Sequence, residues 1–215
     1  MKEIIKEQYG ENPRESYYVS RIINKQHFAR LGNLLNDPFV KASVVYGGSL
    51  DEENLFIEPT ILINPPLKSA IMTDEIFGPL LPIITLDNIE DCVEFIKSRP
   101  KALAVYAFTS DKRLQKRLVD ETSSGGVVFN DTILQYALDN LPFGGVGESG
   151  IGRYHGKYSF DVFTHEKSVL KRSFWVDFWF RYPPWDFKKL QLFKASYRYD
   201  YLKVVLIALG IKKTY

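Results

Sequence analysis

Cysteine is scarce in this sequence, since Cys92 is the single one among 215 residues. A disulfide within the chain is therefore excluded, and so is any zinc or iron–sulfur site that needs several thiolates. The charged start MKEIIKEQYGENPR argues against secretion. These observations predict a protein of a reducing compartment, which we expect to be the cytoplasm.

Long apolar runs are also missing. The tail holds eight successive non-polar residues from Val204, far short of the ~20 that a membrane-spanning helix needs. From Phe187 onward, lysines and aromatic residues are interleaved, which resembles an amphipathic segment lying on a membrane surface. The alternative is a helix packed on the body of the protein. The first of these two interpretations predicts peripheral contact with an intracellular membrane such as the endoplasmic reticulum.

Charge is nearly balanced at +2, but it is unevenly distributed. Residues 181–215 contain eight basic and two acidic residues, a charge of +6, which leaves −4 for residues 1–180. An acidic body with a basic, aromatic tail does not suggest a nucleic-acid partner.

The apolar pattern alternates between helical and strand periods, without internal repeats or low-complexity tracts. Helices are expected at residues 24–36, 89–99, 112–121 and 158–163. Strands are expected at residues 42–46, 56–63, 80–86, 104–108, 127–129 and 168–172. The alternation between residues 80 and 129 predicts parallel strands joined by right-handed crossovers. The expected fold is α/β, a mostly parallel sheet with flanking helices.

Six glycines fall between Gly144 and Gly156. Three of them, Gly145, Gly147 and Gly150, match the dinucleotide pattern GxGxxG. That mechanism needs a strand before the first glycine and a helix after the last, and neither is predicted here. We therefore expect a structural glycine turn.

Other candidate residues favour structural interpretations. Cys92 lies on the apolar face of the helix expected at residues 89–99, which is typical of a packed residue and not of a nucleophile. His27 flanks the apolar stripe of the helix at residues 24–36, and no ligand role is expected for it.

Ser149, His155 and Asp161 lie near one another in the sequence and have the residue types of a hydrolase triad. Ile151 stands where a nucleophile elbow requires glycine, so we reject this triad.

The stretch IMTDEIFGPLLP carries a stronger signal. Asp74 and Glu75 lie at the mouth of the strand expected at residues 80–86, where ligands bind in open α/β sheets. A carboxylate there can accept hydrogen bonds from sugar hydroxyls, and Phe77 offers an apolar face to a ring. A solvated turn is the equally weighted alternative.

Three segments resemble the aldehyde dehydrogenase family, in particular plant members of its class-three branch. They are NPPLKSAIMTDEIFGP followed by LLPI at residues 64–83, LPFGGVGESGIGRYHGKYSFDVFTHEKSVL at residues 141–170, and RYPPW at residues 181–185. The resemblance covers about residues 3–190.

This resemblance implies an enzyme that uses NAD or NADP to oxidise an aldehyde to a carboxylic acid. In the family, a cysteine thiolate adds to the aldehyde, a hydride passes to the nicotinamide, and a glutamate-activated water hydrolyses the thioester. Glu75 matches the residue that holds the nicotinamide ribose hydroxyls. Phe77 matches the aromatic residue beside the nicotinamide. Both are therefore expected cofactor-binding residues.

The family's nucleophile stands in an Asn-x-Gly-Gln-x-Cys context, which this sequence lacks. Cys92 has Asp91 and Val93 as neighbours, so the role does not transfer to it, and neither a catalytic residue nor a metal ligand is assigned. We expect the C-terminal part of an aldehyde dehydrogenase, inactive by itself, with Met1 either a genuine start or the start of a truncated gene model.

The resemblance also predicts how the chain is organised. Residues 1–160 would form part of the catalytic domain, residues 161–182 an arm strand used in homodimers, and residues 183–215 the basic aromatic tail. Some class-three relatives end in membrane-binding tails. The alternative function is a non-catalytic interaction module that pairs with full-length subunits through the strand near residues 168–172.

Overall fold

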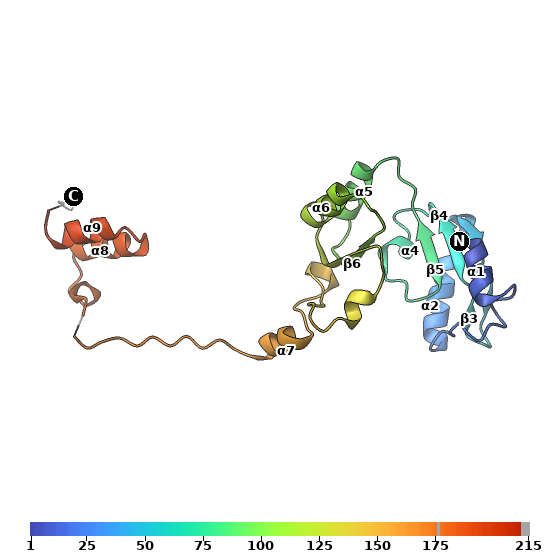
Figure 1. Cartoon of the computed structure of the whole chain (residues 1–215), viewed down its shortest axis with the longest axis horizontal. Coiled ribbons are helices and arrows are strands. Elements are labelled where there is room, and N and C mark those ends of the chain that lie inside the picture. Colours follow the sequence, from blue (N-terminus) through green and yellow to red (C-terminus); the bar gives the residue numbers. More distant parts are fainter. Residues whose placement is uncertain (176, 212–215) are drawn as a thin grey trace. The chain divides into compact units, whose positions relative to one another are not determined.

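The structure is a computed structural model that describes residues 1–175 and 177–211 (Figure 1). The chain divides into two compact units, residues 1–163 and residues 164–215, and each is described by itself.

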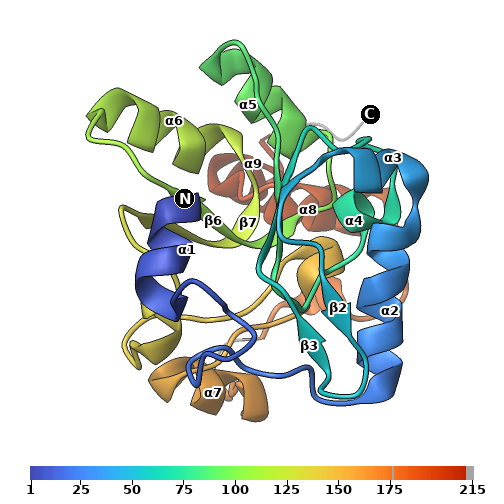
Figure 2. The same ribbon diagram turned by 90° about the vertical axis from the view of Figure 1, so that its right-hand side faces the viewer.

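The N-terminal part of the first unit contains a three-stranded sheet in the order β1-β4-β5. The central strand β4 (Thr60–Ile63) pairs in parallel with β5 (Leu80–Ile83) and antiparallel with β1 (Val44–Tyr46). A separate antiparallel hairpin of β2 (Leu50–Asp51) and β3 (Phe56–Ile57) lies beside α2 (Figure 2).

The longest helix of this part is α2 (Lys25–Asn36). It begins where the Asn24 side chain accepts a hydrogen bond of 2.8 Å from the His27 amide, a standard N-cap. It ends before Pro38, which takes the first position of α3 (Pro38–Ala42). The other helices here are α1 (Lys2–Tyr9) and α4 (Ala70–Thr73).

The main hydrophobic core joins α2 to the sheet. Leu31 and Leu62 are both 0% exposed at its centre. The cluster comprises Phe28, Leu31, Leu34, Leu35, Val40, Ile57, Leu62, Ile71 and Leu80. Each large side chain buried in this way contributes about 1.5–3 kcal/mol, so the cluster fixes α2 against the strands.

The rest of the first unit is built around a parallel pair of strands, β6 (Ala102–Ala107) and β7 (Ser124–Phe129). These strands are joined by α6 (Lys112–Glu121), and α5 (Ile89–Lys97) precedes β6. α5 and α6 lie side by side in Figures 1 and 2, linked by an ion pair of 2.8 Å between Arg117 and Glu90. The unit ends with η1 (Leu134–Ala137), η2 (Gly147–Ser149) and α7 (Gly156–Phe163).

The α/β class is confirmed, with parallel pairs β4–β5 and β6–β7. Two details of the expected sheet are wrong. The strand expected at residues 56–63 is two strands, β3 and β4, because Pro59 interrupts the run and the halves pair in different sheets. Strands β5 and β6 also belong to different sheets, so the expected crossover in one sheet holds for β6–α6–β7 alone.

The second unit contains η3 (Trp179–Arg181), α8 (Phe187–Tyr197) and α9 (Tyr201–Ala208). Leu192, Ala195 and Ile207 are buried between the two α-helices. Lys189, only 7% exposed, donates hydrogen bonds of 2.7 Å to the Tyr182 carbonyl and 2.8 Å to the Pro184 carbonyl. Among the described residues, no helix is both long enough and apolar enough to cross a membrane.

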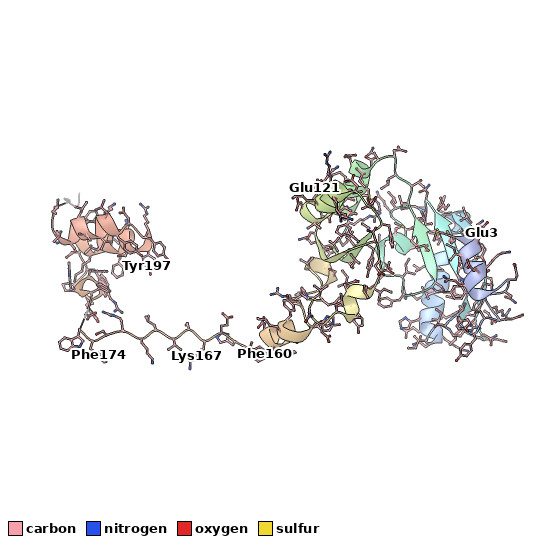
Figure 3. All side chains as sticks on the ribbon, viewed as in Figure 1. Glu3, Glu121, Phe160, Lys167, Phe174 and Tyr197 are labelled. Atoms are coloured by element: carbon pink, nitrogen blue, oxygen red, sulfur yellow. The ribbon has the colours of Figure 1, made fainter. Side chains whose placement is uncertain are left out.

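The strand expected at residues 168–172 is not formed in the single chain. All five residues are described, and none is assigned to a strand. A strand is defined by hydrogen bonds to a neighbouring strand, and no strand of the described chain pairs with this segment. Its side chains, and those of Phe174 and Tyr197, are exposed (Figure 3).

Candidate cofactor site

Glu75 and Phe77 lie on the short segment that connects α4 to β5. The Phe77 side chain is 76% exposed, and its backbone has a φ of 49°, in the left-handed region. A bulky residue in that region costs about 1–3 kcal/mol and is held only when its surroundings enforce it. Phe77 is therefore an exposed aromatic ring on a backbone that its surroundings hold in an unfavourable conformation.

The segment is fixed to α2 by Arg30. One guanidinium nitrogen donates a hydrogen bond of 3.3 Å to the Glu75 carbonyl, and the other terminal nitrogen donates to the Ile76 carbonyl. Ile76 also packs against the main core. The backbone of the two residues before Phe77 is therefore tied to a helix that is itself well anchored.

Glu75 and Phe77 both line one pocket of about 630 Å³. Its walls come from the segment before α2, from α2 itself and from the segment before β5. The pocket is lined by Arg21, Ile22, Ile23, His27, Arg30, Glu75 and Phe77.

The groups around this pocket are of three chemical kinds. The exposed Phe77 ring provides an apolar face, and the Glu75 carboxylate can accept hydrogen bonds from sugar hydroxyls. Arg21 donates hydrogen bonds to the Arg14 and Val19 carbonyls, and Arg30 donates to those of Glu75 and Ile76, so both guanidinium groups fix backbone around the pocket. Aromatic, acidic and basic groups are thus placed around one space.

His27, Arg21 and Arg30 were missed as candidate pocket residues by sequence reasoning. His27, expected to have no ligand role, lies on the wall of the same pocket as Glu75 and Phe77. The i, i+3 spacing of His27 and Arg30 places them on one helix face, which was the available signal. That signal does not show which segment faces the helix, because the pairing of β4 with β5 decides it.

Glu75 also lines a second pocket of about 600 Å³ with Asp74, Arg99, Lys101 and Glu148 among its walls. Arg99 follows α5, and its guanidinium donates hydrogen bonds of 2.8 Å to the Leu67 carbonyl and 3.4 Å to the Met72 carbonyl. The mixed charges of this pocket indicate no single ligand class, and Arg99 has a structural role at the ends of α4.

Comparison with known proteins identifies the family of the chain. The model of the aldehyde dehydrogenase family matches residues 2–169, more than half of the sequence. The chain belongs to the aldehyde dehydrogenase family. It is 56% identical to aldehyde dehydrogenase family 3 member F1 of Arabidopsis thaliana, over 99% of this chain and 44% of that protein. This confirms the resemblance seen in the sequence, including its plant class-three character.

Solved structures of aldehyde dehydrogenases agree with the fold. The substrate-bound state of AldH from Staphylococcus aureus has a TM-score of 0.74 and 44% identity, covering 91% of this chain and 42% of that one. An aldehyde dehydrogenase of Mycobacterium tuberculosis complexed with NAD+ has a TM-score of 0.66 and 28% identity, covering 76% of this chain and 34% of that one. The chain therefore spans about two fifths of the relatives that it matches most fully.

The rejected hydrolase triad is not assembled in this aldehyde dehydrogenase chain. The Ser149 hydroxyl donates a hydrogen bond of 3.0 Å to the Val146 carbonyl and accepts one of 2.9 Å from the Val146 amide. Asp161 pairs with Lys157 on α7. These are the contacts of a turn and of a helix surface.

His155 lies in an aromatic cluster, with ring centres 4.4 Å from Tyr154 and 5.9 Å from Phe143. Its Nδ1 atom is buried without a hydrogen-bond partner. Desolvation raises the pKa of the nearby Tyr154 phenol, and Tyr136 raises it further. The cluster packs the start of α7, and it carries no nucleophile.

The glycine pattern at Gly145, Gly147 and Gly150 is structural, as expected. A Cβ atom at Gly145 would lie 2.1 Å from the Ser149 carbonyl oxygen, so close backbone packing requires glycine. The segment opens the short η2 turn and not a helix that could hold a pyrophosphate.

Cys92 is half-buried on α5, while its neighbour Val93 is fully buried. It was expected to be buried, so the apolar-face interpretation is only partly right. Within the described residues, no group of three or more His, Cys, Asp or Glu is placed to hold a metal ion.

Proposed function

We propose that this chain supplies the nicotinamide-binding part of an NAD- or NADP-dependent aldehyde dehydrogenase. Glu75 accepts hydrogen bonds from the ribose hydroxyls, and Phe77 packs beside the nicotinamide ring. The observation that carries the proposal is that both residues line one pocket, with Phe77 exposed at a positive φ. When bound, the dinucleotide supplies the acceptor for the hydride removed during oxidation of an aldehyde to a carboxylic acid.

The proposal assigns no catalytic residue to these 215 residues. The sequence contains no Asn-x-Gly-Gln-x-Cys segment, and Cys92 stands on α5 between Asp91 and Val93. Oxidation therefore requires the nucleophile and dinucleotide-binding residues that relatives carry in the part this chain does not span. The residues here bind and orient, and they do not attack the aldehyde.

A chimera tests this proposal. The N-terminal portion of the Arabidopsis relative that this chain does not match is joined to residues 1–215, and aldehyde-dependent NAD(P)H formation is followed at 340 nm. We expect turnover by the chimera and none by the chain alone. Glu75→Gln should raise the KM for NAD+ about tenfold, since the carboxylate accepts charge-assisted hydrogen bonds, whereas Glu52→Gln in the β2–β3 turn should not.

Two outcomes contradict the proposal. One is an unchanged KM for NAD+ in the Glu75→Gln chimera. The other is robust turnover by the chain alone that disappears on Cys92→Ser, which would make Cys92 the nucleophile after all.

A second candidate function is pairing with another subunit through residues 168–172. Val169 and Leu170 in this segment are 72% and 89% exposed and belong to no strand of the single chain. Exposed apolar residues in a segment that belongs to no strand favour pairing with an edge strand of a partner, either a second copy in a homodimer or a full-length subunit. Co-expression with the Arabidopsis enzyme followed by size exclusion should give a mixed species, and Leu170→Lys should abolish it. Absence of any mixed or dimeric species would contradict this function.

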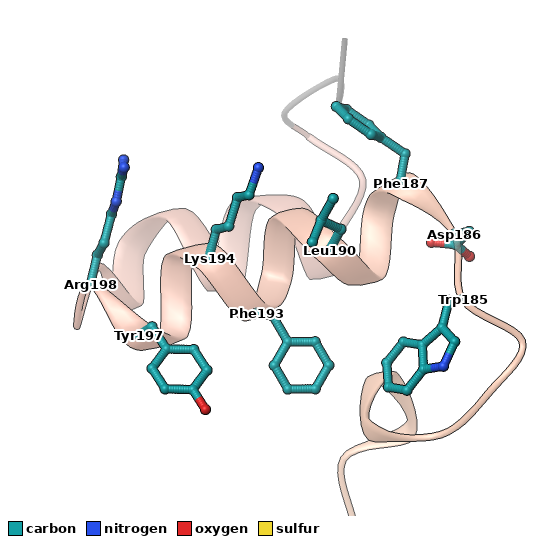
Figure 4. Close-up of a pocket in the computed structure, with 8 residues that line it drawn as sticks. All are labelled: Trp185, Asp186, Phe187, Leu190, Phe193, Lys194, Tyr197 and Arg198. Atoms are coloured by element: carbon teal, nitrogen blue, oxygen red, sulfur yellow. The ribbon is translucent and has the colours of Figure 1, made fainter.

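The tail supports a further proposal about location, that the protein is cytoplasmic and contacts the surface of an intracellular membrane such as the endoplasmic reticulum. α8 carries a groove of about 860 Å³ whose walls are mainly aromatic, apolar and basic, with Asp186 as their acidic residue (Figure 4). Lys194 and Arg198 project to one side of the helix, and Phe193 and Tyr197 project to another. Phe187 and Leu190, 49% and 45% exposed, project to the same side as the two cations, and cations beside exposed apolar side chains suit an anionic lipid surface.

Flotation with vesicles of phosphatidylcholine, with and without phosphatidylserine, tests this location. Binding should require phosphatidylserine and should fall when Lys194 and Arg198 are both changed to Glu. The matched control changes Lys112 and Lys116 on α6 to Glu. A form without residues 183–215 that floats equally well would contradict the proposal.

A further inference from the structure

The segment that carries Glu75 and Phe77 contacts α2 at several of its backbone units. Arg30 donates to the carbonyls of Glu75 and Ile76. A Cβ atom at Gly78 would lie 2.7 Å from both terminal methyl groups of Leu31, so the Gly78 backbone packs directly on that side chain. Two adjacent helix residues, Arg30 and Leu31, thus contact the chain on both sides of Phe77.

The two contacts differ in kind. Leu31 is 0% exposed and holds Gly78 by packing, which belongs to the core and is independent of any ligand. Arg30 is half-buried, lines the pocket and uses two nitrogens of one planar group to fix two successive carbonyls. Two donors in one planar guanidinium group fix both the orientation and the distance of the backbone they bind, which the single ammonium of a lysine does not do.

The backbone conformation at Phe77 explains why the hydrogen bonds from Arg30 are needed. Its φ of 49° is unfavourable for an aromatic residue, so a free segment would relax toward ordinary values. That relaxation would turn the ring and redirect the Glu75 side chain two residues earlier. The segment preceding Phe77 is kept in place by the Arg30 hydrogen bonds and by Ile76, which packs against the core.

We propose that Arg30 is a positioning residue of the cofactor site, which holds the Glu75 carboxylate and the Phe77 ring in the geometry that the nicotinamide ribose and ring require. This role rests on the proposed function of Glu75 and Phe77. Arg30 acts through the backbone, and its guanidinium is occupied by carbonyl oxygens and does not serve the cofactor directly.

Hydrogen exchange of the 215-residue chain tests, without any cofactor, whether Arg30 holds this segment in place. A peptide covering residues 72–80 contains the Asp74 amide, bonded to the Ala70 carbonyl at 2.9 Å, and the Leu80 amide, bonded to the Gly78 carbonyl at 2.9 Å. In Arg30→Met, exchange in this peptide should accelerate at least about threefold, since its anchoring bonds are lost. Exchange in a peptide covering residues 102–107 should stay the same.

The matched control is Lys25→Met. It removes a cation from the same helix, but its side chain is exposed and does not line the pocket. In the Lys25→Met protein, residues 72–80 should exchange at the same rate as in the unmodified chain. If Arg30→Met does not fold by circular dichroism, Arg30→Lys replaces it, because a lysine keeps the charge and loses the two donors of one planar group. Unchanged exchange of residues 72–80 in the folded Arg30 variant overturns the proposal.

A double-mutant cycle in the chimera separates positioning from direct binding of the cofactor. Arg30→Met and Glu75→Gln should each raise the KM for NAD+ about tenfold, with kcat and the KM for aldehyde much less affected. The double variant should fall clearly short of the product of the two single effects, because part of the Arg30 effect is the placement of Glu75. Additive effects, about a hundredfold together, would show that Arg30 binds the cofactor itself and would overturn the proposal.

The results of these experiments distinguish a failure of the proposed cofactor site from a failure of the proposed role of Arg30. An effect of Glu75→Gln without an effect of Arg30→Met leaves the proposed function intact and removes the role of Arg30. No effect of Glu75→Gln overturns the proposed function, and the role of Arg30 with it, even where the segment exchanges faster.

Discussion

Arg117 on α6 donates a hydrogen bond of 2.8 Å to Glu90 on α5, and the same guanidinium donates one of 2.8 Å to Glu121 one turn further along α6. A single cation therefore joins two helices that the chain separates by β6. Hydrogen bonding to Arg117 is the largest influence that holds the pKa of both carboxyls below the ordinary value of 4.5.

The network predicts a pH-dependent contribution to stability. Because the pKa values of Glu90 and Glu121 are lowered in the folded protein, the contribution is fully present above pH 4.5 and is lost as the pH falls through the lowered values. Arg117→Met should therefore lower the Tm at pH 7 and have little effect at pH 3. Thermal melts at the two pH values measure this. Lys112→Met, whose cation contacts the neutral amide of Gln115, is the control. An equal loss of Tm at both pH values would contradict the prediction.

Leu31 tests the core that supports the cofactor segment. It is 0% exposed and contacts the Gly78 backbone. Leu31→Ala should lower the free energy of unfolding by about 2–5 kcal/mol, because it leaves a cavity beneath the segment. Urea denaturation followed by far-ultraviolet circular dichroism measures the change. Leu67→Ala, at a side chain 45% exposed, should cost much less. Equal costs at the two positions would show that the packing around Leu31 is not as described.

Local chemistry made the helices predictable. α6 was expected at residues 112–121 and is found there, since Asp111 accepts hydrogen bonds from the Arg113 and Leu114 amides as an N-cap. α2 was expected from Asn24, which is its N-cap. In both cases the starting signal and the apolar period lie within one short stretch of sequence.

The strands and the pocket depend on distant pairing, which no local pattern shows. Pro59 inside an apolar run was a visible warning that residues 56–63 are not one strand. The parallel pairing of Thr60 with Leu80 brings the Glu75–Phe77 segment against α2, and that contact makes His27 and Arg30 pocket residues. Glu75 and Phe77 themselves could be named because a long family motif surrounds them.

The second unit has its own spectroscopic probe, because all three tryptophans, Trp175, Trp179 and Trp185, lie within it. Lys189→Met should destabilise this unit by about 1–3 kcal/mol, since it leaves the Tyr182 and Pro184 carbonyls without their buried donor. Tryptophan fluorescence during denaturation should show the loss.

Lys194→Met is the matched control for that change, because its side chain is exposed on the same helix. It should leave the fluorescence transition in place. A Lys189→Met transition that coincides with the unmodified one would show that the two carbonyl contacts do not stabilise the unit.

Gly125 and Gly126 are neighbours on β7 with opposite requirements. A Cβ atom at Gly125 would lie 2.0 Å from the Gly144 carbonyl oxygen and 2.6 Å from the Leu103 carbonyl oxygen, whereas one at Gly126 would meet nothing within 4 Å. Gly125→Ala should therefore cost about 1–3 kcal/mol or more, since backbone must shift. Gly126→Ala should be neutral or should stabilise by up to about 1 kcal/mol, because it restricts the unfolded chain. Chemical denaturation of both variants measures the contrast, and equal stabilities would mean that the glycine-rich loop does not pack on β7.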